Sequence, residues 1–214
     1  MFDPVVESAA THCKRALRCI LAAALLCALT VARAAEVSPY DEIAYADEAA
    51  GLKFPQMMAT YRFQQKLDSG NTAQGFSLVY VENTGATATI TFYDAGQLDV
   101  AEGINDPRVR EELRKIDAST KDLVQKGKYK SAKRMDKLAP LSKEWLQVNH
   151  EILLPGGKTV HHYNLVRGYH GKFLRVEVYG APEGTYARLH PFLLSVMRAT
   201  GLMIPGYRPP GVVR

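Results

Sequence analysis

The hydrophobic and polar positions between residues 54 and 93 alternate with a period of two. Residues 56–67, 74–81 and 87–93 each carry aromatic or branched side chains at every second position, and turn signals rich in Gly, Asn and Asp separate them. This alternation predicts three antiparallel strands that bury one face and form a meander.

The next segment changes to a helical period. Asp106 and Pro107 supply an N-cap and a first-turn proline, and apolar residues then recur every three or four positions until Gly127. These signals predict an amphipathic helix with defined ends. Leu113 falls on its apolar stripe and Glu112 on its solvent-facing side.

Three further strands and a second helix complete the pattern. Two glycine-containing turns join the strands into two hairpins. The helix is expected to kink near Pro191, because proline cannot donate the backbone hydrogen bond. The strands are predicted at 145–154, 159–167 and 172–178, and the helix at 186–200.

This order of elements predicts an α+β fold, with an antiparallel sheet of about six to seven strands in two meanders packed by two amphipathic helices. Residues 54–203 form one domain. The acidic, alanine-rich residues 35–53 are expected to form a linker or short helix, and the proline- and glycine-rich residues 204–214 a disordered tail.

The N-terminal residues predict export. A basic cluster precedes an apolar segment over residues 19–32 that is too short to span a bilayer comfortably, and a small-x-small motif ends at Ala34. We therefore expect a signal peptide over residues 1–34 and a periplasmic or secreted mature chain, with retention of the leader as an anchor as the alternative.

Removal of this leader would change the chemistry available to the chain. All three cysteines, Cys13, Cys19 and Cys27, precede the predicted cleavage site, which excludes disulfides, thiol catalysis and zinc–thiolate sites from the mature chain. The formal charge falls from +5 to +3 with the four basic and two acidic residues of the leader. Neither this charge nor an exported location favours a nucleic-acid partner.

The chain resembles the PsbP-like sandwich fold. The residues that carry this resemblance are the first meander, the helix that opens with Asp106-Pro107, the hairpin over residues 163–176 and the terminal helix. It is also similar to uncharacterised secreted bacterial proteins with the turn at 93–96 and the Gly-Tyr-x-Gly-x-Phe hairpin at 168–173. The resemblance implies a non-catalytic accessory or binding module.

One constellation of side chains is a candidate site. If residues 156–157 form a two-residue turn and residues 168–171 close the next hairpin, the strand registers place His162 between Glu151 and Glu177 on one face. Opposed Cβ atoms lie about 5 Å apart, so both carboxylates would favour the imidazolium.

Three interpretations of this face remain open: cross-strand charge complementarity, a divalent metal site, or a general acid/base. A bulge at Gly171 would shift the second hairpin and separate the three residues. His161 is expected on the opposite face of the strand from His162, in a structural role.

A second candidate is the basic segment between the first helix and the later strands. Residues 129–138 lack a clear period and are expected to form a strand or loop. A strand would bring together Lys128, Lys130 and Arg134, which could contact an anionic ligand or membrane surface weakly. A solvated surface is the simpler interpretation.

The sequence thus favours an exported, non-catalytic binding or accessory module over an enzyme. We expect no cofactor, a small-molecule or protein partner, and a monomer. The alternative is a metal-dependent or acid/base enzyme centred on Glu151, His162 and Glu177.

Overall fold

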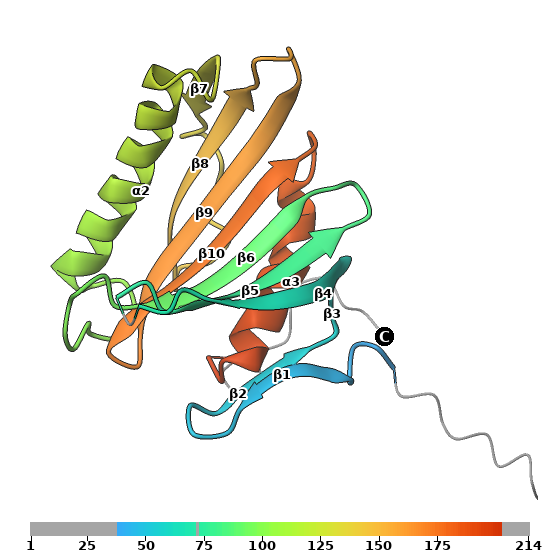
Figure 1. Cartoon of the computed structure of the whole chain (residues 1–214), viewed down its shortest axis with the longest axis vertical. Coiled ribbons are helices and arrows are strands. Elements are labelled where there is room, and N and C mark those ends of the chain that lie inside the picture. Colours follow the sequence, from blue (N-terminus) through green and yellow to red (C-terminus); the bar gives the residue numbers. More distant parts are fainter. Residues whose placement is uncertain (1–37, 72, 203–214) are drawn as a thin grey trace, which may run out of the picture. The chain divides into compact units, whose positions relative to one another are not determined.

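We describe residues 38–71 and 73–202 of a computed structural model (Figure 1). The leader predicted over residues 1–34 and the tail predicted over 204–214 lie outside the described residues. Contacts divide the chain into two units, Met1–Ser38 and Pro39–Arg214, and all the elements below belong to the second. Among the described residues, no helix is both long and apolar enough to cross a membrane.

The described part of the chain is α+β, with antiparallel strands in two sheets and two helices. This confirms the predicted class, although the strands are more numerous than predicted. A small sheet contains β1 (Ile43–Asp47) and β2 (Leu52–Pro55). The large sheet contains β3 (Met57–Met58), β4 (Tyr61–Asp68), β5 (Phe76–Glu82), β6 (Thr87–Tyr93), β7 (Ser131–Arg134), β8 (Leu146–Leu153), β9 (Thr159–Tyr169) and β10 (Lys172–Ala181). The helices are α2 (Pro107–Gln125) and α3 (Tyr186–Ala199).

The large sheet joins two meanders edge to edge. Its strand order is β3-β4-β5-β6-β10-β9-β8-β7, so the last strand of the second meander pairs with the last strand of the first. Val176 pairs with Ile90 at the centre of this junction. The junction makes one continuous eight-stranded sheet, and each helix packs on one face of this sheet.

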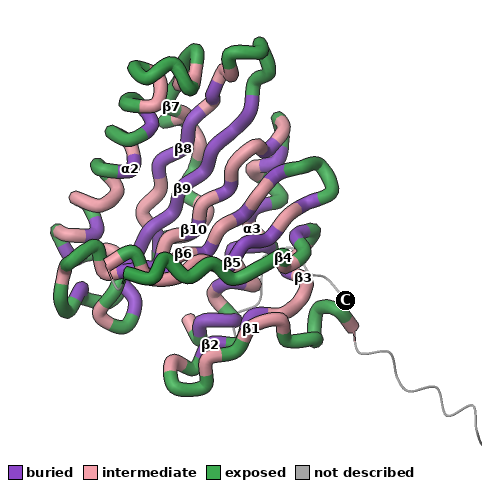
Figure 2. The backbone as a smooth tube through the Cα atoms, viewed as in Figure 1, coloured by how far each residue is buried: buried purple, intermediate pink, exposed green. Residues whose placement is uncertain are grey.

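The two helices contact opposite faces of this sheet. On one face α3 and the β1–β2 hairpin cover a core that includes Phe54, Tyr80, Leu165 and Phe192. On the other face α2 packs over β7, β8 and β9, where Val109 and Val166 lie in a second, smaller core. Figure 2 shows buried residues along almost the whole of β9, which lies between both cores.

The linker or short helix predicted over residues 35–53 is wrong where the structure places strands. Residues 43–47 form β1, which pairs with β2. Leu52 and Phe54 of β2 are buried against the core under α3. The acidic, alanine-rich composition concealed this hairpin, because its strands are fixed by tertiary burial and not by a strong local pattern.

The predicted ends of α2 are confirmed. Oδ1 of Asp106 accepts a hydrogen bond from the backbone N–H of Arg108 at 2.8 Å, and Pro107 occupies the first turn. Gly127, with φ of +69°, follows the helix in the left-handed conformation that glycine adopts without strain. Local sequence signals therefore set the length and position of α2.

A close backbone approach occurs where β9 ends. Gly168 forms a bridge with Gly103, and a Cβ atom at Gly168 would lie 1.8 Å from the carbonyl oxygen of Ala101. Only glycine allows the 101–103 segment to lie this close to β9. The contact also holds the chain that leads into α2 against the sheet.

Candidate functional site

The strand registers differ from those that the sequence suggested. His150 pairs with His162, and Glu151 pairs with His161. The turn contains three residues, 155–157, because the N–H of Leu154 donates to the carbonyl of Lys158 and Gly157 is left-handed. A three-residue loop in place of the predicted two-residue loop shifts the pairing by one position and reverses the face of each β8 side chain.

The predicted Glu151–His162–Glu177 triplet is therefore wrong. Glu151 lies on the face of the sheet that α3 covers, with Oε2 3.8 Å from Nε2 of His161. His162 and Glu177 lie together on the α2 face, where Nε2 of His162 is 2.6 Å from Oε1 of Glu177. The opposite orientation of His161 and His162 is confirmed.

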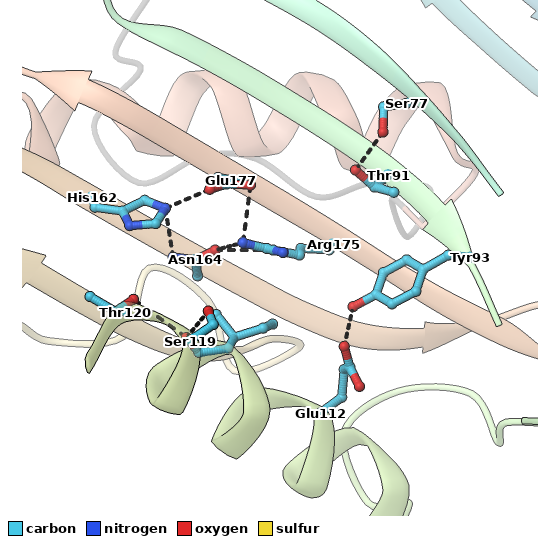
Figure 3. Close-up of polar contacts among 11 residues, drawn as sticks. Ser77, Thr91, Tyr93, Glu112, Ser119, Thr120, His162, Asn164, Arg175 and Glu177 are labelled. Carbon is cyan, nitrogen blue, oxygen red and sulfur yellow. Dashed lines mark hydrogen bonds and ion pairs between the residues drawn. The ribbon is translucent and has the colours of Figure 1, made fainter. Parts of the chain in front are cut away.

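His162 and Glu177 belong to a polar cluster on the α2 face, which we define as His150, His162, Asn164, Arg175, Glu177 and Asp117. Arg175 connects two of its members (Figure 3): its Nη2 lies 3.0 Å from Oε2 of Glu177 and 2.6 Å from Oδ1 of Asn164. Burial disfavours the charge on Glu177, but the hydrogen bond from His162 and the charge of Arg175 outweigh it, and the pKa of Glu177 is lowered. Glu177 is therefore ionised at neutral pH.

His150 connects this cluster to α2. Its Nε2 lies 2.8 Å from Oδ1 of Asp117, and its side chain is almost fully buried. Burial lowers the pKa of His150, and the nearby Asp117 opposes this only in part. Nδ1 of His150 is buried without a hydrogen-bond partner within residues 38–71 and 73–202. His150 is accordingly neutral and donates from Nε2 to the helix.

Most hydrogen bonds of the polar cluster are made within the chain, although Nδ1 of His162, like Nδ1 of His150, has no hydrogen-bond partner among the described residues. Nδ1 of His162 is buried, and the ring of Tyr179 packs edge-on against His162 with centroids 5.4 Å apart. Within residues 38–71 and 73–202, no group of three or more His, Asp or Glu side chains is placed to hold a metal ion. The cluster therefore has the geometry of a buried polar contact between α2 and the sheet.

The basic segment lies at the edge of the sheet. Lys128 and Lys130 are exposed and precede β7, which contains Arg134. Arg134 forms ion pairs with Asp136 at 2.6 Å and with Asp117 at 3.6 Å. Its charge is thus partly neutralised, and contact of this segment with an anionic surface stays a prediction.

A cavity of about 440 Å³ lies on the other face of the sheet, between α3 and the loop that precedes β8. Its apolar wall contains Leu141, Leu193, Leu194, Met197 and Leu202. The cavity residues of α3 recur at three- and four-residue spacing, so they share one side of the helix. The volume falls within the range of about 300–1,000 Å³ that small-molecule sites occupy.

Hydrogen bonds hold the loop of this cavity in place. Oε1 of Gln147 accepts from the N–H of Leu141 at 3.0 Å, and Nε2 of Gln147 lies 3.0 Å from Oη of Tyr186 on α3. Tyr186 also donates to the carbonyl of Ala139. These bonds connect the loop, β8 and α3, so the cavity has a fixed frame.

Arg167 is the buried charge of the cavity. Its side chain is 6% exposed, and its guanidinium lies over the ring of Trp145 at 5.7 Å. Nη1 is 3.6 Å from Oε2 of Glu144, a separation too long for a hydrogen bond. Burial lowers the pKa of Arg167, and Glu144 and Glu102 oppose this only in part. The guanidinium is still charged at neutral pH, because arginine is so strong a base that its side chain stays protonated in proteins.

The sequence contains a signal for Arg167, although Arg167 was not among the predicted site residues. Arg167 has the same parity in β9 as Tyr163 and Leu165, which belong to the buried face. A charged residue at an apolar position of a strand indicates a buried polar site. The neighbours of Arg167 could not be predicted from the sequence, because Trp145 and α3 lie next to it only in the folded chain.

The described part of the chain is an α+β protein, in which two helices pack on an antiparallel sheet. The chain is similar to the solution structure of cyanobacterial PsbP (CyanoP) from Synechocystis sp. PCC 6803, as the resemblance in its sequence suggested. The match covers 79% of this chain and 97% of that chain, with 11% identity and a TM-score of 0.42. Scans against family models and curated proteins found no match.

Proposed function

We propose that this protein is an exported, periplasmic binding module that holds a small, largely apolar ligand in the cavity between α3 and the 141–144 loop. The observation that carries this proposal is the cavity itself, with about 440 Å³ of space and a wall of leucine and methionine side chains. Concave, mostly apolar sites with few polar groups are typical of small-molecule binding.

The hydrogen bonds that connect the loop of the cavity to β8 and α3 support a binding role. Leu193 is buried in the main core, and Leu194 and Met197 lie on the same helix at the cavity wall. A ligand would therefore enter a site that is already formed, which reduces the entropy lost on binding. Methionine adapts its shape easily and suits ligands of more than one form.

The proposed location rests on the N-terminal sequence and is tested separately. A basic cluster, a short apolar segment and Ala32-Arg33-Ala34 fit a cleaved leader. Fractionation of the expressing bacterium should place a shortened chain in the periplasm. Recovery of the uncleaved chain in the cytoplasm would contradict export without affecting the cavity.

The binding proposal is tested with N-phenylnaphthylamine, a neutral apolar dye whose fluorescence increases in apolar surroundings. The purified protein should enhance its fluorescence, and decanol should displace it. Leu194→Trp should weaken the enhancement by occupying part of the cavity, whereas Leu98→Trp, at a side chain that is 81% exposed, should leave it unchanged. Equal enhancement by both variants would refute binding at this cavity.

A further inference from the structure

The charge of Arg167 is poorly compensated for a buried group. Within the described residues, Nε of Arg167 donates a hydrogen bond of 3.3 Å to the carbonyl of Gly168. Its ion pair with Glu144 is 3.6 Å long. A buried charge is costly unless it is paired and hydrogen-bonded, because the interior solvates it poorly. The guanidinium therefore favours a closer anion.

Glu144 is held loosely in this ion pair. Its side chain is 60% exposed. The backbone N–H of Glu144 donates a 3.1 Å hydrogen bond to Oγ of Ser142, but this bond does not involve the carboxylate. When the carboxylate turns into solvent, it gives up only the 3.6 Å ion pair with Arg167. Lys143 and His190 also line the cavity, so the surroundings of Arg167 include other basic groups.

We infer that the ligand of this cavity is an amphiphile with a single anionic headgroup of the carboxylate type, which displaces Glu144 and binds Arg167 directly. This inference rests on the proposed function and names its ligand class. The planar guanidinium presents paired N–H donors that match a carboxylate in a bidentate arrangement. The apolar chain lies against Leu194, Met197 and Leu202, which line the same cavity.

The roles of the two charged residues are then distinct. Arg167 recognises the headgroup, and Trp145 holds the guanidinium in place through its ring. Glu144 acts as a counter-ion in the empty site and competes with the ligand for Arg167. Removal of its charge should therefore strengthen anion binding, which is the opposite of what loss of a ligand contact would do.

The experiment compares decanoate, decanol and decyltrimethylammonium, three probes with the same chain, as competitors of N-phenylnaphthylamine. The wild type should bind decanoate at least tenfold more tightly than decanol and should bind the cation weakest. Arg167→Met should reduce this preference to less than twofold while decanol still binds. Glu144→Gln should increase decanoate affinity severalfold and leave decanol unchanged.

The controls separate this inference from the proposed function. Lys158→Gln removes an exposed charge on the turn between β8 and β9 and should change nothing. Displacement of the dye by decanol with no preference for decanoate would overturn the inference and keep the apolar binding site. Failure of all probes to bind would overturn both. A weaker affinity of Glu144→Gln for decanoate would refute the displacement of Glu144, and this exposed variant tests it even if Arg167→Met does not fold.

Discussion

Phe192 provides a direct test of how α3 is seated on the sheet. Its side chain is 1% exposed, and its ring centroid lies 4.8 Å from that of Tyr61 and 6.1 Å from that of Tyr80. Phe192→Ala should therefore leave a cavity between α3 and two strands. Core Phe→Ala changes cost about 3–5 kcal/mol, and the two ring contacts place the expected loss of unfolding free energy at about 4–5 kcal/mol.

Urea unfolding and thermal melting measure this loss. For a chain of this size, each kcal/mol lowers Tm by about 2–4 °C, so Phe192→Ala should melt about 8–20 °C below the wild type. Phe192→Leu keeps most of the apolar volume, so its Tm should lie between those of Phe192→Ala and the wild type. Leu98→Ala, at an exposed position, should stay within about 0.5 kcal/mol of the wild type. A loss below about 1 kcal/mol for Phe192→Ala, with an unchanged m-value, would refute the packing of α3 on this face.

Three further predictions concern the α2 side of the fold. The lowered pKa of His150 means that the unfolded chain binds its proton more readily, so stability should fall as the pH drops below about 6.5, and again below about 4 as the hydrogen-bonded carboxylates of the polar cluster protonate. Urea midpoints across this range test both steps, and His150→Gln should remove the upper one. Glu112→Ala should cost about 1–2 kcal/mol because it removes the 2.8 Å partner of the Tyr93 hydroxyl, and an unchanged midpoint would contradict that contact. Gly168→Ala should cost about 3 kcal/mol or more through its backbone clash, whereas Gly156→Ala, which meets no atom within 4 Å, should be nearly neutral in the same melting assay.

The prediction for Glu112 also shows a limit of helical periodicity. The sequence placed Glu112 on the solvent-facing side of α2, yet its side chain is 12% exposed and accepts a hydrogen bond from Tyr93. The helix phase was sufficient to place Val109 and Ile116 in the core. Periodicity gives the apolar stripe, but a polar residue at the border of that stripe is buried or exposed according to what the sheet presents to it.

Local features of the sequence determined much of the fold. The N-cap at Asp106 and the glycine at position 127 set the ends of α2. Both act locally, because Asp106 caps the backbone two residues away and Gly127 adopts the left-handed conformation by itself. The period of two placed Tyr163 and Leu165 on the buried face of β9, since neighbouring side chains of a strand point to opposite sides. The α+β class and the opposite orientations of His161 and His162 follow from these short-range rules.

Tertiary structure decided the features that depend on contacts between distant segments. The pairing of β6 with β10 and the burial of the β1–β2 hairpin depend on contact energies that are spread over many residues. The one-residue shift between β8 and β9 depends on the geometry of one turn. That shift moved Glu151 to the opposite face from His162 and removed the predicted site. The cavity around Arg167 arises only when α3, the loop before β8 and β9 meet, because no single segment contains both its apolar wall and its charge.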